Sequence, residues 1–350
     1  MKILLTGDKG YIGTVLSEKL RRLGHSVTGL DTNYFADCTM GKMGKINSGE
    51  YHIDMDIRDV QIESLMRIDA IIHLAALSND QMGDIGESLT REINFEATEN
   101  LAVCAKAAGI HKFIFASSCS VYGDGSGEDW CSEDGKTNPL TAYAKSKLDS
   151  EKALLSLKDE NFCPVILRNA TVYGFSPRLR NDLVVNAMTS NAFTTENLKV
   201  FGDGSLYRPL IHVDDLSNAF IIALESDEGI VSGEVINVGF TKENWQIENI
   251  ANLVKSVLIG TEIEHVSQVG DTRNYRVNFD KIQTIFPNFI QTKTVEDSIL
   301  ELVETFERLE CVREMNFTLD DLTGRRYVRL KQLKYLMGVG RLDNNLRWTI

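Results

Sequence analysis

The chain has 350 residues, of which 43% are hydrophobic and 25% are charged, and its formal net charge is −13. This composition is typical of a globular protein with one large domain or two ordinary ones. The acidic balance works against general affinity for nucleic acid or an anionic membrane, so we expect neither as a partner.

The N-terminal run MKILLTGDKG reaches a glycine within seven residues, which is too short for a signal peptide or a membrane span. The cysteines form no C-x-x-C pair and no cluster with histidine at zinc spacing. We therefore expect reduced thiols, no metal site and a cytoplasmic protein. The cysteines are Cys38, Cys104, Cys119, Cys131, Cys163 and Cys311.

Five apolar runs in the first half have the length and the β-branched or aromatic content of buried strands. They are residues 2–7, 26–31, 70–76, 112–118 and 164–170. The stretches with helical periodicity between them are residues 14–24, 59–67, 92–109 and 144–157. This alternation predicts an α/β fold of the Rossmann type, a doubly wound parallel sheet with helices on both faces.

After Tyr173 the alternation loosens, and irregular segments carry glycine or proline together with arginine. We therefore predict a Rossmann domain over residues 1–173. Residues 174–310 are expected to form a smaller mixed α/β lobe that binds the substrate and is interleaved with the first domain.

Residues 311–350 form a basic extension of unassigned role, with seven Lys or Arg residues against two Asp from Asp321 onward. Its run RYVRLKQLKYLM predicts an amphipathic helix packed on the body of the protein or on a neighbouring subunit. The alternative is a lid that contacts phosphate, or an arm that binds a partner.

The first predicted strand runs into a glycine-rich turn that opens directly into a helix. Gly7 permits the tight turn, Gly10 lets the backbone approach a pyrophosphate, and Gly13 lets helix and strand pack closely. Tyr11 and Ile12 lie within the same turn, where the helix N-terminus offers unpaired N–H groups to an anion. The pattern predicts a dinucleotide site.

Asp31 ends the second predicted strand, where a carboxylate accepts hydrogen bonds from ribose hydroxyls and repels a 2′-phosphate. No arginine follows immediately in DTNYF, so NAD is favoured over NADP as the cofactor. Asp56 and Ile57 are expected near the adenine, and the small residues of HLAAL along the cofactor. That run contributes Leu74, Ala75 and Ala76. The alternative is another nucleotide in the crevice, or none.

Tyr143 and Lys147 are four residues apart, so a helix places both on one face. A lysine beside a phenol lowers the pKa of the phenol, and the nicotinamide charge acts in the same direction. Tyr143 could then accept a proton from a sugar hydroxyl as hydride leaves the carbon, with Ser118 bonded to the same oxygen. Tyr143 and Lys147 are also expected to lie along the cofactor.

Eight motifs occur along the first 290 residues or so: TGDKGYIG, DMDIRD, HLAAL, SSCSVYG, YAKSK, LRNATVYG, FGDGSLYRPLIHVDD and INVG. In these motifs the chain resembles the extended short-chain dehydrogenase/reductase family of nucleotide-sugar epimerases and dehydratases over about residues 1–290. The resemblance implies tightly held NAD, a nucleoside diphosphate sugar as substrate, a Ser118, Tyr143 and Lys147 triad, and a homodimer.

The resemblance also implies substrate-binding residues. Arg208 and Arg273 match arginines that hold the diphosphate, which suits the bidentate guanidinium fork; the alternative for each is a surface ion pair. Ser78 and Thr171 complete the expected set, although the family often has asparagine where this chain has Thr171.

Dehydratases and UDP-glucuronate decarboxylases of the family carry an acid just after the catalytic Ser or Thr, where this chain has Cys119 and Ser120. We therefore favour an NAD-dependent epimerase acting at C4 through a transient keto-sugar. The main alternative is a reductase or dehydrogenase of a keto-sugar nucleotide with exchangeable cofactor. A 4,6-dehydratase and a non-catalytic NAD-binding scaffold are further alternatives.

Overall fold

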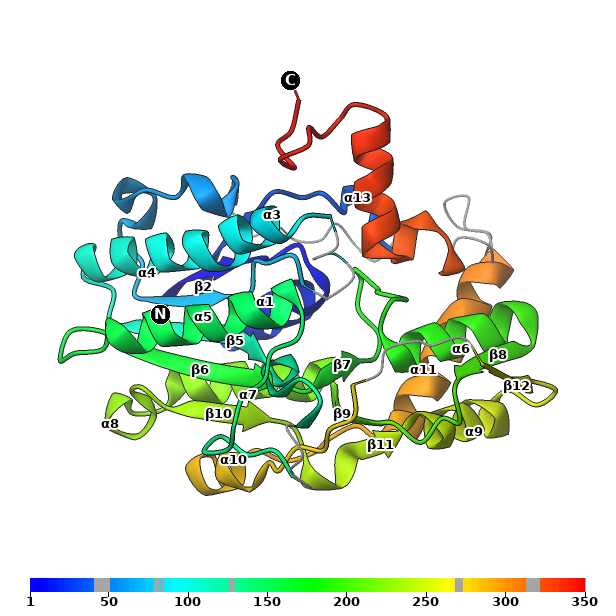
Figure 1. Cartoon of the computed structure of the whole chain (residues 1–350). Helices are drawn as coiled ribbons and strands as arrows, with labels where there is room; N and C mark the ends of the chain where they lie inside the picture. The colour runs from blue at the N-terminus through cyan, green and yellow to red at the C-terminus, as the bar shows by residue number, and fades with distance from the viewer. Residues whose placement is uncertain are drawn as a thin grey trace.

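The computed structural model describes residues 1–40, 51–78, 82, 85–125, 130–267, 273–312 and 322–349. Within these residues the largest element is a seven-stranded sheet in the order β10-β6-β5-β4-β1-β2-β3, and its strand pairs are parallel (Figure 1). Its strands are β1 (Lys2–Thr6), β2 (Ser26–Asp31), β3 (His52–Asp54), β4 (Ala70–His73), β5 (Lys112–Ser118), β6 (Cys163–Asn169) and β10 (Val235–Val238). The predicted Rossmann-type α/β fold is confirmed.

Helices cover both faces of this sheet. They are α1 (Tyr11–Arg22) and α7 (Val213–Glu225) on one face, and α4 (Ala97–Ala107) and α5 (Ala142–Ser156) on the other. Successive residues of β1 point to opposite faces, because side chains alternate along a strand. Ile3 and Leu5 are buried with α1 and α7, whereas Leu4 is buried with α4 and α5. The core therefore consists of two apolar layers.

The helix predicted over residues 59–67 is wrong. Two 3₁₀ turns, Ile57–Asp59 and Ile62–Leu65, occupy this region and are separated by extended Val60. The Val60 side chain is fully buried, and its carbonyl accepts a hydrogen bond from Asn100 Nδ2 at 3.0 Å. The burial of Val60 and its hydrogen bond to a residue of α4 stabilise the extended backbone at this position, which interrupts the predicted helix.

The remaining strands form two small sheets, one of which is mixed, and this confirms the predicted smaller lobe. They are β7 (Thr171–Tyr173), β9 (Tyr207–His212) and β11 (Asn244–Gln246) in one sheet, and β8 (Asn197–Phe201) and β12 (Glu262–Val266) in the other. Helices α6 (Val184–Thr195), α9 (Ile247–Val257) and α11 (Val295–Val312) pack against them. Strand β10 and helix α7 follow residue 173 in the chain but belong to the large sheet and the helices that cover it. The domain boundary at residue 173 therefore stays a prediction.

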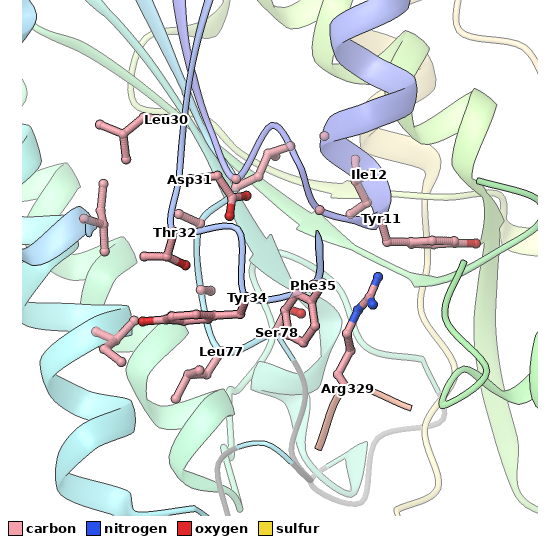
Figure 2. A pocket seen from close by; sticks show the side chains of 18 of the residues that line it. Tyr11, Ile12, Leu30, Asp31, Thr32, Tyr34, Phe35, Leu77, Ser78 and Arg329 are labelled. Carbon is pink, nitrogen blue, oxygen red and sulfur yellow. The ribbon is translucent and has the colours of Figure 1, made fainter. Parts of the chain in front are cut away.

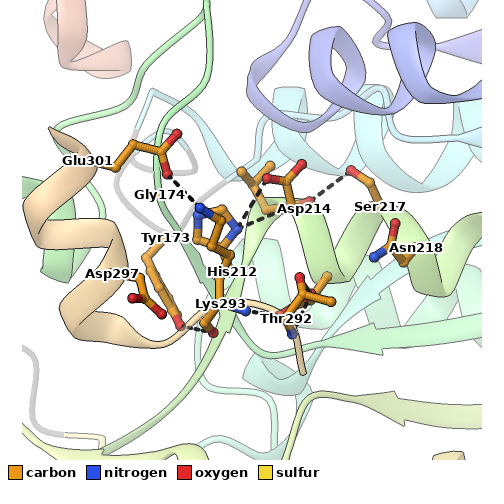
Figure 3. Close-up of polar contacts among 12 residues, drawn as sticks. Tyr173, Gly174, His212, Asp214, Ser217, Asn218, Thr292, Lys293, Asp297 and Glu301 are labelled. Carbon is orange, nitrogen blue, oxygen red and sulfur yellow. Dashed lines mark hydrogen bonds and ion pairs between the residues drawn. The ribbon is translucent and has the colours of Figure 1, made fainter. Parts of the chain in front are cut away.

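A polar junction, in which His212 is buried, joins the smaller lobe to the large sheet (Figure 3). His212, which ends β9, caps α7 by accepting a hydrogen bond at Nδ1 from the backbone N–H of Asp214, at 3.1 Å. Thr292 donates its backbone N–H to Asp215 of α7 at 3.1 Å, and Lys293 pairs with Glu301 of α11 at 3.6 Å. These contacts hold the start of α7 against the end of β9 and against the segment that precedes α11.

The C-terminal segment, residues 322–349, packs on the same chain; residues 313–321 lie outside the described part. Its helix α13 (Arg329–Gly338) and the turns that follow bury four leucines in the α4 side of the core. They are Leu333, Leu336, Leu342 and Leu346. The shorter elements of the chain are α3 (Glu87–Arg91), a π-helical turn (Glu92–Glu96), α8 (Glu228–Val231), α10 (Asp280–Ile285), and 3₁₀ turns at Ala36–Cys38, Cys119–Tyr122, Thr241–Glu243 and Arg325–Tyr327.

Candidate active site

Two adjoining clefts lie at the carboxyl ends of the parallel strands. From β1 the chain builds the sheet outward to β3 and then returns to β4 on the other side of β1. Loops on the two sides diverge at such a switch point and leave a crevice for a ligand. The first cleft is lined by residues of the glycine turn, by residues at the ends of β2 and β4, and by Arg329 of α13.

The glycine turn forms the wall of the first cleft. Gly7 has φ of +74°, and a Cβ there would lie 2.9 Å from the backbone nitrogen of Ala75. A Cβ on Gly13 would lie 2.0 Å from the carbonyl oxygen of Gly7, so only glycine allows this packing. No side chain caps the start of α1, and its first turn has no acidic residue. Its N–H groups therefore suit a pyrophosphate.

Asp31 points into this cleft (Figure 2). Its carboxylate accepts hydrogen bonds from the backbone N–H groups of Lys9, at 3.2 Å, and Asn33, at 2.6 Å. Burial raises the pKa of Asp31, and the two N–H donors counteract that effect. A carboxylate held in this way suits the hydroxyls of a ribose.

Every residue predicted to bind the cofactor lines one of the two clefts. Those in the first are Gly7, Gly10, Tyr11, Ile12, Gly13, Asp31, Asp56, Ile57, Leu74, Ala75 and Ala76. The carboxylate of Asp56 is already bonded to Arg58, at 2.9 Å from its Nε. Burial alone would raise the pKa of Asp56, but the hydrogen bonds from Arg58 lower it.

The second cleft opens directly from the first and contains the predicted catalytic and substrate-binding residues. It is lined by Ser78, Ser118, Tyr143, Lys147, Thr171, Arg208 and Arg273. The two clefts share Tyr11, Ile12, Leu74, Ala76, Ser78 and Arg180. Together they form a continuous space from Asp31 to the two predicted diphosphate arginines, although no contact in the structure tests the role of any of these residues.

Helix α5 carries Tyr143 and Lys147 on one face, and Thr141 caps its start by accepting the N–H of Ala144 at 3.1 Å. The Lys147 amino group lies 5.8 Å from the centre of the Tyr143 ring. It donates a hydrogen bond to the carbonyl of Ala116 at 2.8 Å. Burial lowers the pKa of Lys147 to about 7, while the charge of Glu151 acts in the opposite direction. The lysine is therefore fixed close to the phenol.

Ser118 ends β5 and starts the following 3₁₀ turn, where its Oγ accepts the N–H of Ser120 at 3.1 Å. Behind it, Arg168 and Glu151 form a buried ion pair at 2.8 Å between β6 and α5. Ser117 also donates a hydrogen bond to Glu151. This network ties β5, β6 and α5 together and so positions Ser118 relative to α5.

Three further polar residues enter the clefts. Arg180 donates a hydrogen bond to Ser78 Oγ at 3.0 Å, and its buried Nη2 has no partner in the described part of the chain. Asn169, at the end of β6, lines the second cleft, and its buried Oδ1 likewise has no partner among the described residues. Arg329 enters the first cleft from α13. The segment GFSPRLR gives a weak signal for Arg180, and the basic run RYVRLKQLKYLM gives one for Arg329 through the alternative of a lid that contacts phosphate. The motif LRNATVYG contains Asn169 but does not single it out.

In the part of the chain that the structure describes, no group of three or more His, Cys, Asp and Glu side chains could hold a metal ion. No described helix is long and apolar enough to cross a membrane.

Residues 3–239 match the model of the NAD dependent epimerase/dehydratase family. The chain belongs to this family. It is 30% identical over 295 residues to UDP-glucose 4-epimerase of Mycolicibacterium smegmatis, which covers 79% of this chain and 90% of that protein. It is 27% identical to UDP-N-acetyl-α-D-glucosaminuronate decarboxylase of Bacillus cytotoxicus, over 88% of this chain and 98% of that protein.

Among solved structures, UDP-glucuronic acid 4-epimerase from Bacillus cereus, in complex with UDP-glucuronic acid and NAD, is 28% identical with a TM-score of 0.76. The similarity covers 88% of this chain and all of that one. As a member of the family, the chain is an NAD-dependent enzyme that modifies nucleotide sugars. The uncapped glycine turn and the partnerless nitrogen of Arg180 in the same cleft are suited to such an anionic dinucleotide.

Proposed function

We propose that this enzyme is an NAD-dependent C4 epimerase of a nucleoside diphosphate sugar. The observation that carries the proposal is the juxtaposition of Ser118, Tyr143 and Lys147 on the second cleft, where it opens from the glycine-turn cleft. The 4-epimerases among its relatives support the choice of reaction. NAD bound in the first cleft supplies a hydride acceptor and then a hydride donor.

The side chains of the triad have separate tasks. Tyr143 accepts the proton of the sugar hydroxyl and later returns it to the keto oxygen, as a positioned acid–base group. Lys147, fixed by its bond to the Ala116 carbonyl, favours the phenolate when it carries its own proton. Because Ser118 Oγ already accepts the N–H of Ser120, its own hydrogen is free to donate to the sugar oxygen.

Several residues are proposed to hold the substrate. Arg208 and Arg273 line the far side of the second cleft, where their guanidinium groups suit the diphosphate. In the family an asparagine at the position of Thr171 often contacts the sugar. We assign this contact to Asn169, because Asn169 lines this cleft and its buried Oδ1 has no hydrogen-bond partner among the described residues.

The residue after Ser118 argues against dehydration. Cys119 is 1% exposed and donates a hydrogen bond from Sγ to the carbonyl of Arg168 at 3.3 Å. Burial raises its pKa well above the ordinary value. Such a thiol is a poor acid for the expulsion of water from a sugar.

The reaction is tested by incubating the purified enzyme with UDP-glucose, UDP-glucuronic acid and their N-acetylated counterparts, without added cofactor, and following products by NMR. Formation of the C4 epimer without added NAD is expected. A requirement for stoichiometric NADH or NADPH would instead identify a reductase.

Replacement of the proposed acid–base group gives a second test. Tyr143→Phe should lower turnover by roughly 10²- to 10⁴-fold while NAD binding, measured by calorimetry, is retained. Tyr335→Phe is the matched control, since Tyr335 is 43% exposed on α13. Unchanged epimerisation in Tyr143→Phe would remove this residue from the chemistry.

The resemblance also leads us to propose a cytoplasmic homodimer in which α5 contributes to the interface. Val103 of α4, on the same face of the sheet, is 49% exposed and is available for such a contact. Light scattering coupled to gel filtration should give twice the chain mass of 39.2 kDa.

A further inference from the structure

The C-terminal segment brings a cation into the cofactor cleft. Arg329 is the first residue of α13, is 2% exposed and lines the cleft together with Gly10 and Asp31. Figure 2 shows its guanidinium group pointing toward Tyr11, at the start of α1. Arg329 lies outside residues 3–239, the part of the chain that matches the family model.

The hydrogen bonding of this guanidinium is incomplete. Its Nη2 donates to the carbonyl of Arg178 at 2.6 Å, and the group lies 4.2 Å from the centre of the Phe35 ring. Its Nη1 is buried and has no partner among the described residues. A buried donor of a charged group that stays unpaired is costly, so the arrangement indicates a ligand that accepts from Nη1.

The charges around Arg329 favour the binding of an anion. Burial lowers the pKa of Arg329 to about 10; the charges of the buried Arg180 and Arg178 act in the same direction, whereas Cys38 and Asp182 oppose it. The carboxylate of Asp182 pairs with Arg180 at 2.9 Å, and no carboxylate among the described residues forms such a pair with Arg329. Two guanidinium groups, those of Arg329 and Arg180, and the positive end of α1 thus border the same cleft.

We propose that Arg329 binds the pyrophosphate of NAD, so that the C-terminal segment completes the cofactor site. A guanidinium opposite a helix N-terminus gives a diphosphate donors on two sides. The inference depends on NAD as the cofactor and is independent of the reaction that the enzyme catalyses.

The rest of the segment is anchored to the loop that follows Asp31. Tyr34 donates a hydrogen bond from its hydroxyl to the carbonyl of Leu346, and Trp348 donates from Nε1 to the carbonyl of Thr32 at 2.7 Å. Arg347 pairs with Asp59 beside the same loop. The segment therefore holds both the cation and the loop on the ribose side of the cleft.

The test uses the full-length protein freed of nucleotide, with Arg329→Met, Arg329→Lys and the control Arg341→Met, titrated calorimetrically with NAD, ADP and adenosine. Arg341 is exposed on the same segment and stacks on Trp348. Arg329→Met should weaken NAD and ADP by roughly 10- to 100-fold, the effect of one charge-assisted hydrogen bond. Adenosine, which has no phosphate, should bind as it does to the unaltered protein.

Arg329→Lys keeps the charge without the planar fork and should recover part of the lost affinity. Thermal unfolding of each nucleotide-free variant checks that it is folded; should Arg329→Met not fold, the comparison of ADP with adenosine in Arg329→Lys takes its place. The proposal is wrong if NAD affinity is unchanged in the folded variants, or if adenosine and ADP weaken equally. Either result would leave Arg329 with a purely structural role.

Discussion

His73 ends strand β4 behind the cofactor cleft, with both ring nitrogens hydrogen-bonded in the core. Thr98 gives its hydroxyl hydrogen to the carbonyl of Asn94 at 2.7 Å, so it accepts from His73 Nε2–H at 2.8 Å. Thr6 accepts the N–H groups of Leu74 and Ala75, so its hydroxyl donates to His73 Nδ1 at 2.7 Å. This pattern fixes one neutral tautomer, because a second ring proton would face the hydrogen of Thr6.

Stability should fall in mild acid because of this residue. Burial, and then the charge of Lys147, lower the pKa of His73 to about 3, against about 6.5 in the unfolded chain. Above pH 6.5 neither state binds the proton; below it the unfolded state binds it first, so stability is lost progressively down to about pH 3. The loss at pH 5 is about 2 kcal/mol.

Urea unfolding of the wild type and of His73→Gln at pH 7.5 and pH 5 measures this effect. Glutamine does not titrate, so the stability difference between the two proteins should shrink by about 2 kcal/mol at the lower pH. A difference independent of pH would mean that His73 is not buried in its neutral form.

Among the elements, the π-helical turn Glu92–Glu96 places Asn94 between two parts of the site. Asn94 accepts the N–H of Leu77 at 2.8 Å and donates to the carbonyl of Leu77 at 3.2 Å. It also donates to Ser146 Oγ, on α5, at 3.3 Å. Such turns occur often at functional sites. Here the turn fixes the segment after β4 against the helix that carries Tyr143.

Asn94→Ala should therefore reduce both stability and turnover. Loss of the partner of Leu77 leaves buried backbone groups unpaired, which costs about 1–3 kcal/mol, and frees the loop that lines the cofactor. Asn100→Ala is the control, because Asn100 also bonds a backbone carbonyl, that of Val60, but away from the clefts. Equal turnover in the two variants, compared by NMR assay and urea unfolding, would show that Asn94 has no positioning role.

Elements encoded by adjacent residues were predictable, and those that depend on distant partners were not. The glycine turn and the five buried strands follow from local spacing and side-chain type, which fix turn geometry and burial. Residues 59–67 have a helical pattern, but Val60 bonds to Asn100, 40 residues further along the chain. The same limit applies to Arg329, because its place in the cleft depends on the packing of Leu333 and Leu336 against the core.

At the scale of the whole molecule, the second cleft is lined by residues of both the large sheet and the smaller lobe, and it opens from the first cleft, so we expect ligands in the two clefts to stabilise the entire fold. NAD at 100 times its Kd should raise the free energy of unfolding by about 2.7 kcal/mol. A nucleotide sugar that fits the second cleft should raise Tm further when NAD is already present. Thermal shift with a panel of nucleotide sugars measures this, and a panel without effect would contradict a sugar-nucleotide site in the second cleft.

The hydrogen bonds that tie Leu346 and Trp348 to the loop after β2 also bear on when the cofactor site forms during translation. Translation delivers the glycine turn long before these two residues, so an elongating chain lacks their hydrogen bonds to the loop after β2 until they emerge. With Arg329 proposed on the pyrophosphate, we expect firm cofactor binding only once residues 329–348 have been synthesised. A stop codon before residue 329 would leave Ser118, Tyr143 and Lys147 encoded, and we expect the truncated enzyme to lose its dinucleotide readily.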